Sequence, residues 1–104
     1  MIDLIEITIQ SGIEKKEVLL FPNKNIAYIN DKKIGITEQD INNILDIIFP
    51  WKKEYGTRSG IDLEEWQIKI ISNNEETIYH GKGIYPNTYQ ELKRLVGEFN
   101  GREN

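Results

Sequence analysis

The fold is decided by residues 64–99, which read EEWQIKIISNNEETIYHGKGIYPNTYQELKRLVGEF. The first part of this stretch alternates large apolar residues with Gln67 and Lys69, and such a period of two is typical of a half-buried strand. The apolar face of this strand consists of Trp66, Ile68 and Ile70. The asparagine pair that follows tolerates the left-handed backbone of a tight turn. The stretch therefore predicts a β-hairpin.

The length of the turn determines which side chains of the return strand, residues 77–83, share a face with Trp66. A three-residue loop would bring Ile78 and His80 to that face. We expect a two-residue loop within residues 73–75, because it brings small residues opposite a large ring and leaves room for it. This register places three residues on the tryptophan face: Tyr79, Gly81 and Gly83.

A helix is expected directly after the hairpin. Pro86 has a preset φ and no N–H to lose, which suits a helix start. Asn87 or Thr88 can cap the helix, and Thr88 with Glu91 has the spacing of a capping box. Apolar residues then recur at helical spacing: Tyr89, Leu92, Leu95, Val96 and Phe99. We expect this stripe to pack on the tryptophan face and the helix to end at Asn100-Gly101.

Three short strands are expected before this stretch. Residues 5–9 alternate isoleucine with polar residues, and residues 26–30 form a third strand after a turn. Residues 17–21 between them are apolar on both sides, which suits a central strand. Residues 30–33 form the next turn. Because sequential strands usually pair, the simplest arrangement is an antiparallel meander.

A second helix is expected from Thr37, which can cap it, with Asp40 at its third position. Its apolar stripe consists of Ile41, Ile44, Leu45 and Ile48. Pro50 should end or kink this helix, because proline lacks a donor and clashes with the preceding turn. Trp51 and Tyr55 nevertheless continue the helical spacing, so a kink or a short second helical piece stays open.

The element order is thus β-β-β-α-β-β-α over residues 1–104. Runs of strands with appended helices predict one α+β domain. We expect an antiparallel or mixed sheet of about five strands, with both helices on one face. The other face would be partly exposed or covered by a partner.

Composition limits the function. The chain has 13 basic and 17 acidic residues and a net charge of −4, which disfavours nucleic acid and anionic lipid and favours a basic partner. Without cysteine it has no disulfide, no thiolate nucleophile and no cysteine metal site. No apolar run approaches the ~20 residues of a membrane helix, and the residues MIDLIEITIQ lack the basic start and cleavage site expected of a secretory signal. We expect a cytoplasmic protein without cofactor or metal.

His80 is the sole histidine. With Tyr79 and Tyr85 nearby in sequence, it could act as a general base or proton donor. However, no nucleophile or carboxylate stands at a telling spacing. A solvent-facing strand residue across from Gln67 or Lys69 is the better interpretation.

Two other patterns lack the features that define a ligand site. Gly81-Lys82-Gly83 matches neither the Walker nor the dinucleotide-binding pattern, so we expect these glycines to serve packing in a strand. A short acidic cluster lacks the twelve-residue pattern of a calcium loop. It consists of Asp62, Glu64 and Glu65.

Residues 50–58 combine aromatic rings with three positive charges in an acidic chain. Such residues are enriched in protein-binding hot spots; they also stack on nucleic-acid bases, but the net charge disfavours that partner. The predicted partner-binding residues are Trp51, Lys52, Tyr55 and Arg58. The plainer alternative places Trp51 and Tyr55 in the core under the first helix, with the charges solvated.

The chain also resembles a group of small uncharacterised bacterial domains. The residues that carry the resemblance are Ile61–Ile70, Tyr79-His80-Gly81 and Tyr85–Leu92. Members share a tryptophan strand, a return strand with glycine and a Tyr-Pro-Asn helix start, over about the last half of this chain. Many have Asp-Gly where this chain has Asp62-Leu63. The resemblance implies a fold and no activity.

Two classes of function remain. The leading hypothesis is a small, acidic, non-catalytic binding protein, most simply an inhibitor such as an immunity protein or a phage-type anti-defence protein, with a basic protein as partner. The exposed sheet face or the Trp51–Arg58 segment would make the contact. The alternative is a small enzyme or nucleotide-binding regulator that uses His80 with nearby tyrosine and acidic residues. Self-association through an edge strand is a further alternative.

Overall fold

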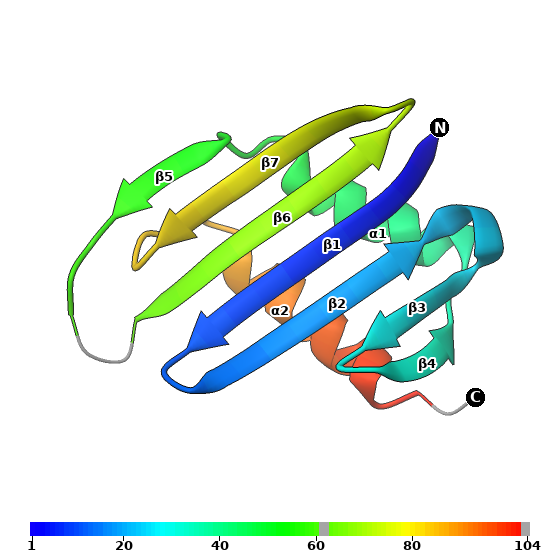
Figure 1. Cartoon of the computed structure of the whole chain (residues 1–104), viewed down its shortest axis with the longest axis horizontal. Coiled ribbons are helices and arrows are strands. Elements are labelled where there is room, and N and C mark those ends of the chain that lie inside the picture. The colour runs from blue at the N-terminus through cyan, green and yellow to red at the C-terminus, as the bar shows by residue number, and fades with distance from the viewer. Residues whose placement is uncertain (61–62, 103–104) are drawn as a thin grey trace.

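The computed structural model describes residues 1–60 and 63–102. This part of the chain contains seven strands and two helices, joined by turns and loops (Figure 1). In chain order they are β1 (Ile2–Ser11), β2 (Glu14–Phe21), β3 (Ile26–Ile29), β4 (Lys32–Gly35), α1 (Glu38–Ile48), β5 (Glu54–Thr57), β6 (Glu64–Ser72), β7 (Glu75–Lys82) and α2 (Tyr89–Asn100). A 3-10 turn, η1 (Pro22–Lys24), links β2 to β3.

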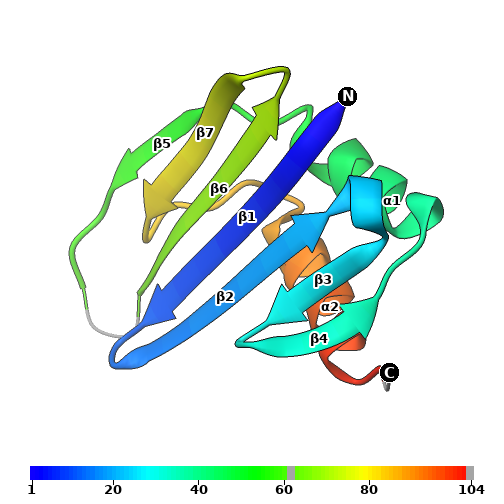
Figure 2. The ribbon, with the colours of Figure 1, turned by 45° about the vertical axis from the view of Figure 1, so that its right-hand side comes forward.

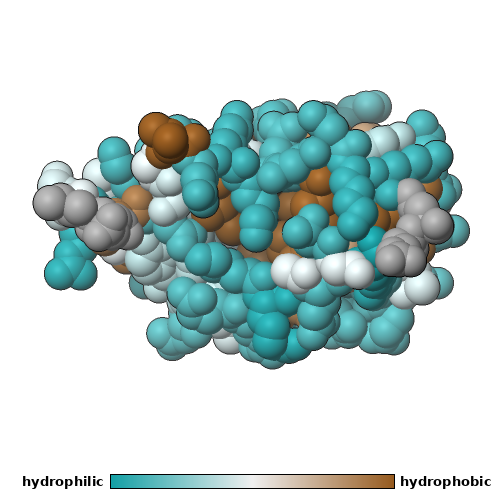
Figure 3. Space-filling model, turned by 90° about the horizontal axis from the view of Figure 1, so that it is seen from below, coloured by the Kyte–Doolittle hydropathy of each residue, from teal (hydrophilic) through white to brown (hydrophobic). Residues whose placement is uncertain are grey.

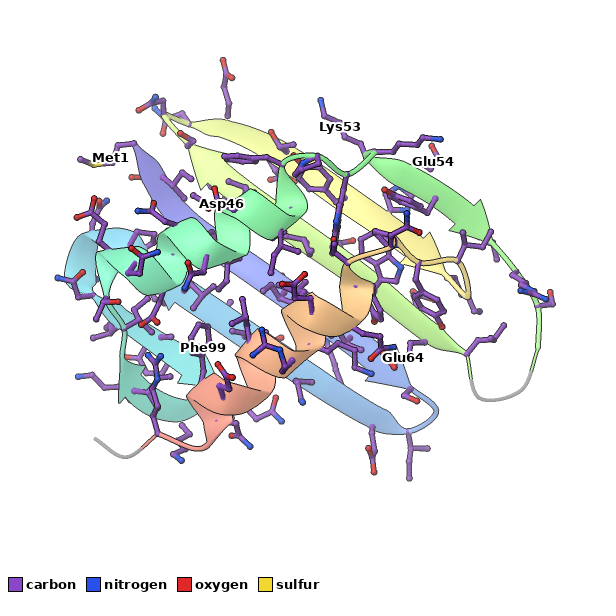
Figure 4. All side chains as sticks on the ribbon, turned by 180° about the vertical axis from the view of Figure 1, so that it is seen from behind. Met1, Asp46, Lys53, Glu54, Glu64 and Phe99 are labelled. Carbon is purple, nitrogen blue, oxygen red and sulfur yellow. The ribbon has the colours of Figure 1, made fainter. Side chains whose placement is uncertain are left out.

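The strands form one mixed sheet in the order β4-β3-β2-β1-β6-β7-β5. All neighbours pair antiparallel except β5 and β7, which are parallel. The central strand is β1, and β2 lies beside it. Both helices cover one face of the sheet, as Figure 4 shows from behind the view of Figure 1, and the turned view of Figure 2 shows the twist of the strands.

The α+β class is confirmed, but the sheet has two more strands than expected. Asn30 and Asp31 have φ angles of 45° and 72° and close a turn by themselves, so β4 pairs back on β3 where the sequence indicated a longer turn. The first helix ends at Ile48 before Pro50, as expected. Beyond it the helical spacing does not continue as a helix, because β5 pairs with the edge of β7.

The β6–β7 hairpin has the expected register. Asn73-Asn74 forms the two-residue turn, with φ angles of 53° and 65°. Trp66 pairs with Gly81, and Tyr79 lies on the same buried face. Gly83 follows the end of β7 with a φ of 70°. A left-handed backbone at both turn residues is what a tight hairpin requires, which explains the asparagine pair.

The start of α1 is also as expected. The Thr37 hydroxyl accepts a hydrogen bond from the Asp40 backbone N–H at 3.1 Å, and the Asp40 carboxylate accepts one from the Thr37 N–H at 2.8 Å. This capping box pairs two backbone donors that the helix leaves unpaired.

The start of α2 differs from the expected capping box. Thr88 is the N-cap, but its hydroxyl makes no capping bond. It accepts a hydrogen bond from the Trp51 indole N–H at 2.7 Å instead. The threonine therefore ties the start of α2 to the segment after α1. The helix ends at Asn100, as expected.

Trp66 is the centre of the core and is only 1% exposed. Its indole N–H donates to the Ile84 carbonyl at 3.0 Å. Three aromatic rings surround it with centroid distances of 5.6 to 5.8 Å, in the edge-on and tilted arrangements that aromatic rings favour. These rings are Trp51, Tyr55 and Tyr89. No residue of a polar or charged type is buried within the described ranges.

The end of α2 is tied to the start of α1 by an ion pair. The Arg102 guanidinium donates to both carboxylate oxygens of Asp40, at 2.7 and 2.9 Å, and stacks over the Phe99 ring at 4.7 Å. The hydrogen bonds from Arg102 lower the pKa of Asp40 from 3.8 to about 2. The same carboxylate thus caps one helix and holds the residue that follows the other.

Seen from below, the surface is mostly hydrophilic, and hydrophobic residues show between the polar ones near its middle (Figure 3). Neither helix in the described ranges has the length and apolar character needed to cross a bilayer.

Candidate functional site

The face of the sheet opposite the helices is uncovered, and it is turned toward the reader in Figure 1. We call it the open face. Because side chains alternate along a strand, every second residue points to this face. The strand registers align these residues in rows across the sheet; one row runs from Leu19 through Glu6 and Lys69 to Ile78.

One half of the open face is mostly apolar, with Glu6 and Lys69 between Leu19 and Ile78. Seven half-buried apolar side chains lie there on adjacent strands: Leu4, Leu19, Phe21, Ile26, Tyr28, Ile71 and Ile78. The rings of Phe21 and Tyr28 contact edge to face, with centroids 6.0 Å apart, and the Lys24 ammonium lies 5.8 Å from the Phe21 centroid. Residues 17–21 are therefore apolar on both sides because one side belongs to this patch, which no other element of the described chain covers.

The other half of the open face is polar and slightly hollowed, with a volume of about 430 Å³. Its lining includes Glu6, Thr8, Glu17, Gln67 and His80. Two wide ion pairs border it, Lys15–Glu17 at 4.0 Å and Lys82–Glu65 at 3.9 Å. Such exposed pairs add little to stability, so these side chains are free to rearrange against a partner.

His80 lies in this hollow as an exposed strand residue opposite Gln67, as the sequence indicated. Tyr79 points to the buried face, and the Tyr85 hydroxyl bonds the backbone of Glu64. Within the described ranges the His80 side chain makes no hydrogen bond or ion pair that would orient it, and no group of His, Asp or Glu is placed to hold a metal. The tyrosines expected near His80 therefore do not join it.

The four predicted partner-binding residues do not form one surface. Trp51 is buried, and the hydroxyl of the half-buried Tyr55 accepts a hydrogen bond from the Lys52 N–H at 3.0 Å. The side chains of Lys52 and Arg58 are exposed. The aromatic residues thus complete the core around Trp66, and the charged residues face solvent.

A polar cluster that the sequence did not indicate surrounds Glu64 on the helix side. Its carboxylate accepts hydrogen bonds from the Tyr89 hydroxyl, at 2.8 Å, and from the Lys93 ammonium. Burial, together with the hydrogen bond to Glu64, raises the pKa of Tyr89. A second hollow of about 450 Å³ adjoins it, with Ile9 and Lys16 in its wall. The sequence does show that Tyr89 and Lys93, four residues apart, share one face of the helix. It does not show that both contact Glu64 on a strand.

The expected acidic cluster is divided by the fold. Glu64 faces the helices, and Glu65 lies on the open face beside Lys82. Asp62 lies outside the described residues. The Gly81 backbone packs against Trp66, as expected for a packing glycine.

No protein-family model matches this chain, and neither the curated proteins nor the solved structures contain a significant match. The open face combines a mostly apolar half that carries two aromatic rings with a polar half.

Proposed function

We propose that this chain is a non-catalytic binding domain that docks a protein partner on the open face of its sheet. The observation that carries the proposal is the run of seven apolar side chains on the uncovered face. Single exposed apolar residues are normal on a soluble protein, whereas a contiguous patch rimmed by polar residues is typical of an interaction site.

The size of the face fits a protein partner. The molecule measures 38 by 29 Å across the view of Figure 1, so the face has an area of roughly 1,000 Å², against about 800 Å² per partner in a standard interface. The aromatic pair Phe21–Tyr28 would be its anchor, since aromatic residues dominate hot spots.

The partner that we propose is a basic protein that this chain inhibits, as an immunity protein or a phage-type anti-defence protein does. The net charge of −4 supports this choice, because opposite charges accelerate encounter. The polar half carries carboxylates at Glu6, Glu17 and Glu65 beside Lys15 and Lys82, so the net charge of the whole chain, and not of this face, favours a basic partner.

A photo-crosslinking amino acid tests the proposal. Placed at Tyr28 on the open face, it should crosslink one defined basic protein in a lysate of the source organism. Placed at the exposed Phe49 beside α1, it should not. The protein identified must then bind the purified wild-type chain and bind the Leu19→Asp variant at least about tenfold more weakly. Equal crosslinking from Phe49, or binding that Leu19→Asp leaves unchanged, would contradict the proposal.

A second candidate function is a nucleotide-binding regulator or small enzyme that uses His80, and the hollow around His80 favours it. The ring resonances of His80 should then shift on titration with ATP or GTP. The His80→Ala variant should keep its stability and lose the nucleotide response. Unchanged His80 resonances at millimolar nucleotide would exclude this function.

A further inference from the structure

We propose that, before the target arrives, a second copy of this chain covers the open face, and that the resulting two-fold dimer must separate before the target docks. We infer the dimer from the strand order and the registers of the sheet. Its regulatory role rests on the proposed function, because both occupants would use the same face.

The position of β1 makes the face self-complementary. Three strands lie on each side of β1 in the sheet. A two-fold axis along β1 therefore places β2 over β6, β3 over β7 and β4 over β5 of the other copy, in the aligned packing common to stacked sheets. Such an axis keeps each residue at its level along the strands. The apolar half of one copy thus meets the apolar half of the other.

This arrangement brings together several side chains that match in chemistry and three pairs that do not: Leu19 with Lys69, Ile26 with Glu76, and Glu6 with Glu6 on the axis, where Lys69 of each copy lies beside it. Phe21 on β2 lies at the level of Ile71 on β6, and Tyr28 on β3 lies at the level of Ile78 on β7. In the polar half, Lys15 on β2 and Glu65 on β6 both align with Gln10 on β1. Lys15 of one copy would therefore face Glu65 of the other, twice per dimer.

The charge of the face permits self-association. From β4 to β7 across the sheet, the open face carries four acidic and four basic side chains. They are Glu6, Glu17, Glu65 and Glu76, and Lys15, Lys33, Lys69 and Lys82. Glu54 on β5 aligns with His80 and adds one more carboxylate to this face. Most of the net charge of −4 still lies elsewhere, so two copies meet here with little net repulsion.

The edges of the sheet offer a poorer route to self-association. The edge strands β4 and β5 are four residues long each, and β4 begins with two lysines. Short strands and lysine are the devices by which proteins protect sheet edges. The open face is therefore the surface that two copies would share.

Single cysteines test the axis directly, since the chain has none of its own. Thr8 lies on β1, so Thr8→Cys places two thiols beside the axis, and a short bismaleimide should link the copies. Thr57→Cys, on the edge strand β5, is the control. Six strand spacings of about 4.8 Å separate its two copies by roughly 29 Å, so it should not link. Linking of Thr57→Cys and not Thr8→Cys would overturn the proposed axis.

A charge swap tests the facing pair. Lys15→Glu and Glu65→Lys should each weaken the dimer about threefold or more in analytical ultracentrifugation, and the double variant should regain most of the loss. Phe21→Asp should weaken it at least about tenfold, whereas Ile13→Ser, at the exposed tip of the β1–β2 turn, should leave it unchanged. Circular dichroism checks the fold of each variant. If Phe21→Asp unfolds, the Lys15→Glu and Glu65→Lys variants still test the proposed dimer.

The outcomes separate this inference from the proposed function. A wild-type chain that stays monomeric at high micromolar concentration overturns the dimer, whether or not a target is found. A dimer without any target crosslinked at Tyr28 overturns the proposed function and leaves the dimer standing. A target that binds the Thr8→Cys-linked dimer as tightly as the monomer overturns the regulatory role.

Discussion

Gly81 lies directly opposite Trp66 in the β6–β7 hairpin, and a Cβ atom at Gly81 would lie 2.9 Å from the indole nitrogen and 2.9 Å from the Ile84 carbonyl oxygen. These are the two atoms that form the hydrogen bond holding the indole. The absence of a side chain at one residue therefore allows the central ring of the core to bond the backbone.

Replacing Gly81 with alanine should destabilise the protein by about 2–3 kcal/mol, because neither the ring nor the backbone can move away cheaply. Gly97→Ala is the matched control. A Cβ there meets nothing within 4 Å, and alanine in a helix is about 0.5–1 kcal/mol more favourable than glycine. The urea concentration at the midpoint of unfolding should thus fall for Gly81→Ala and rise for Gly97→Ala. A neutral Gly81→Ala would contradict the packing described for Trp66.

The ion pair of Asp40 with Arg102 should make stability depend on pH. The folded pKa of Asp40, about 2, lies below its ordinary 3.8. The ionised Asp40 carboxylate therefore makes its full contribution to the free energy of unfolding above about pH 4, and this contribution is lost as the pH falls from about 4 to 2. We expect a loss of about 1–2 kcal/mol, since Arg102 is partly exposed.

Asp40→Asn should remove this part of the pH dependence, and Asp46→Asn, an exposed position on the same helix, should not. Unfolding by urea at several pH values between about 5 and 2 measures the difference. Identical profiles for the wild type and Asp40→Asn would show that the ion pair does not form in solution.

The hydrogen bond between Trp51 and Thr88 should stabilise the protein more than a helix cap alone. Thr88→Ala leaves the buried indole N–H without a partner, and we expect a loss of about 1–3 kcal/mol. Thr88→Ser keeps the hydroxyl and should lose less than about 0.5 kcal/mol. Tryptophan fluorescence during unfolding measures the stability of both variants. If Thr88→Ala and Thr88→Ser lose the same free energy of unfolding, the methyl group of threonine and not its hydroxyl is responsible.

The Asn73-Asn74 turn should favour glycine over alanine. Both residues have positive φ, which costs a residue with an ordinary Cβ about 1–2 kcal/mol. Asn74→Ala should therefore lower the melting temperature, and Asn74→Gly should keep or raise it. If alanine were as stable as glycine, the turn would have a different shape in solution.

Local patterns predicted the parts of the fold that depend on local physics. The register of Trp66 against Gly81 follows from the length of one turn, and the Thr37–Asp40 cap follows from a spacing of three residues. The strands β4 and β5 were missed because each is four residues long and is formed by its neighbour in the sheet. Their own sequences carry too few residues to show a period.

The candidate site was predicted only in part. The expectation that one sheet face would stay uncovered agrees with the structure, and Leu19 and Phe21 gave a signal that we interpreted as central burial. The aromatic residues of 50–58 pointed to a partner but complete the core. Sequence alone could not distinguish these cases, because an aromatic ring near a lysine has the same pattern whether it faces a partner or its own core.

The central place of β1 has a consequence for the order in which the molecule is built. Its two neighbours are β2, which follows after a short turn, and β6, which is more than 50 residues further along the chain. On the ribosome β1 can therefore complete one ladder early, while its second row of amide and carbonyl groups stays unpaired until β6 has emerged. Such distant pairing slows folding, and a nascent chain in that state would expose an apolar sheet edge that chaperones recognise.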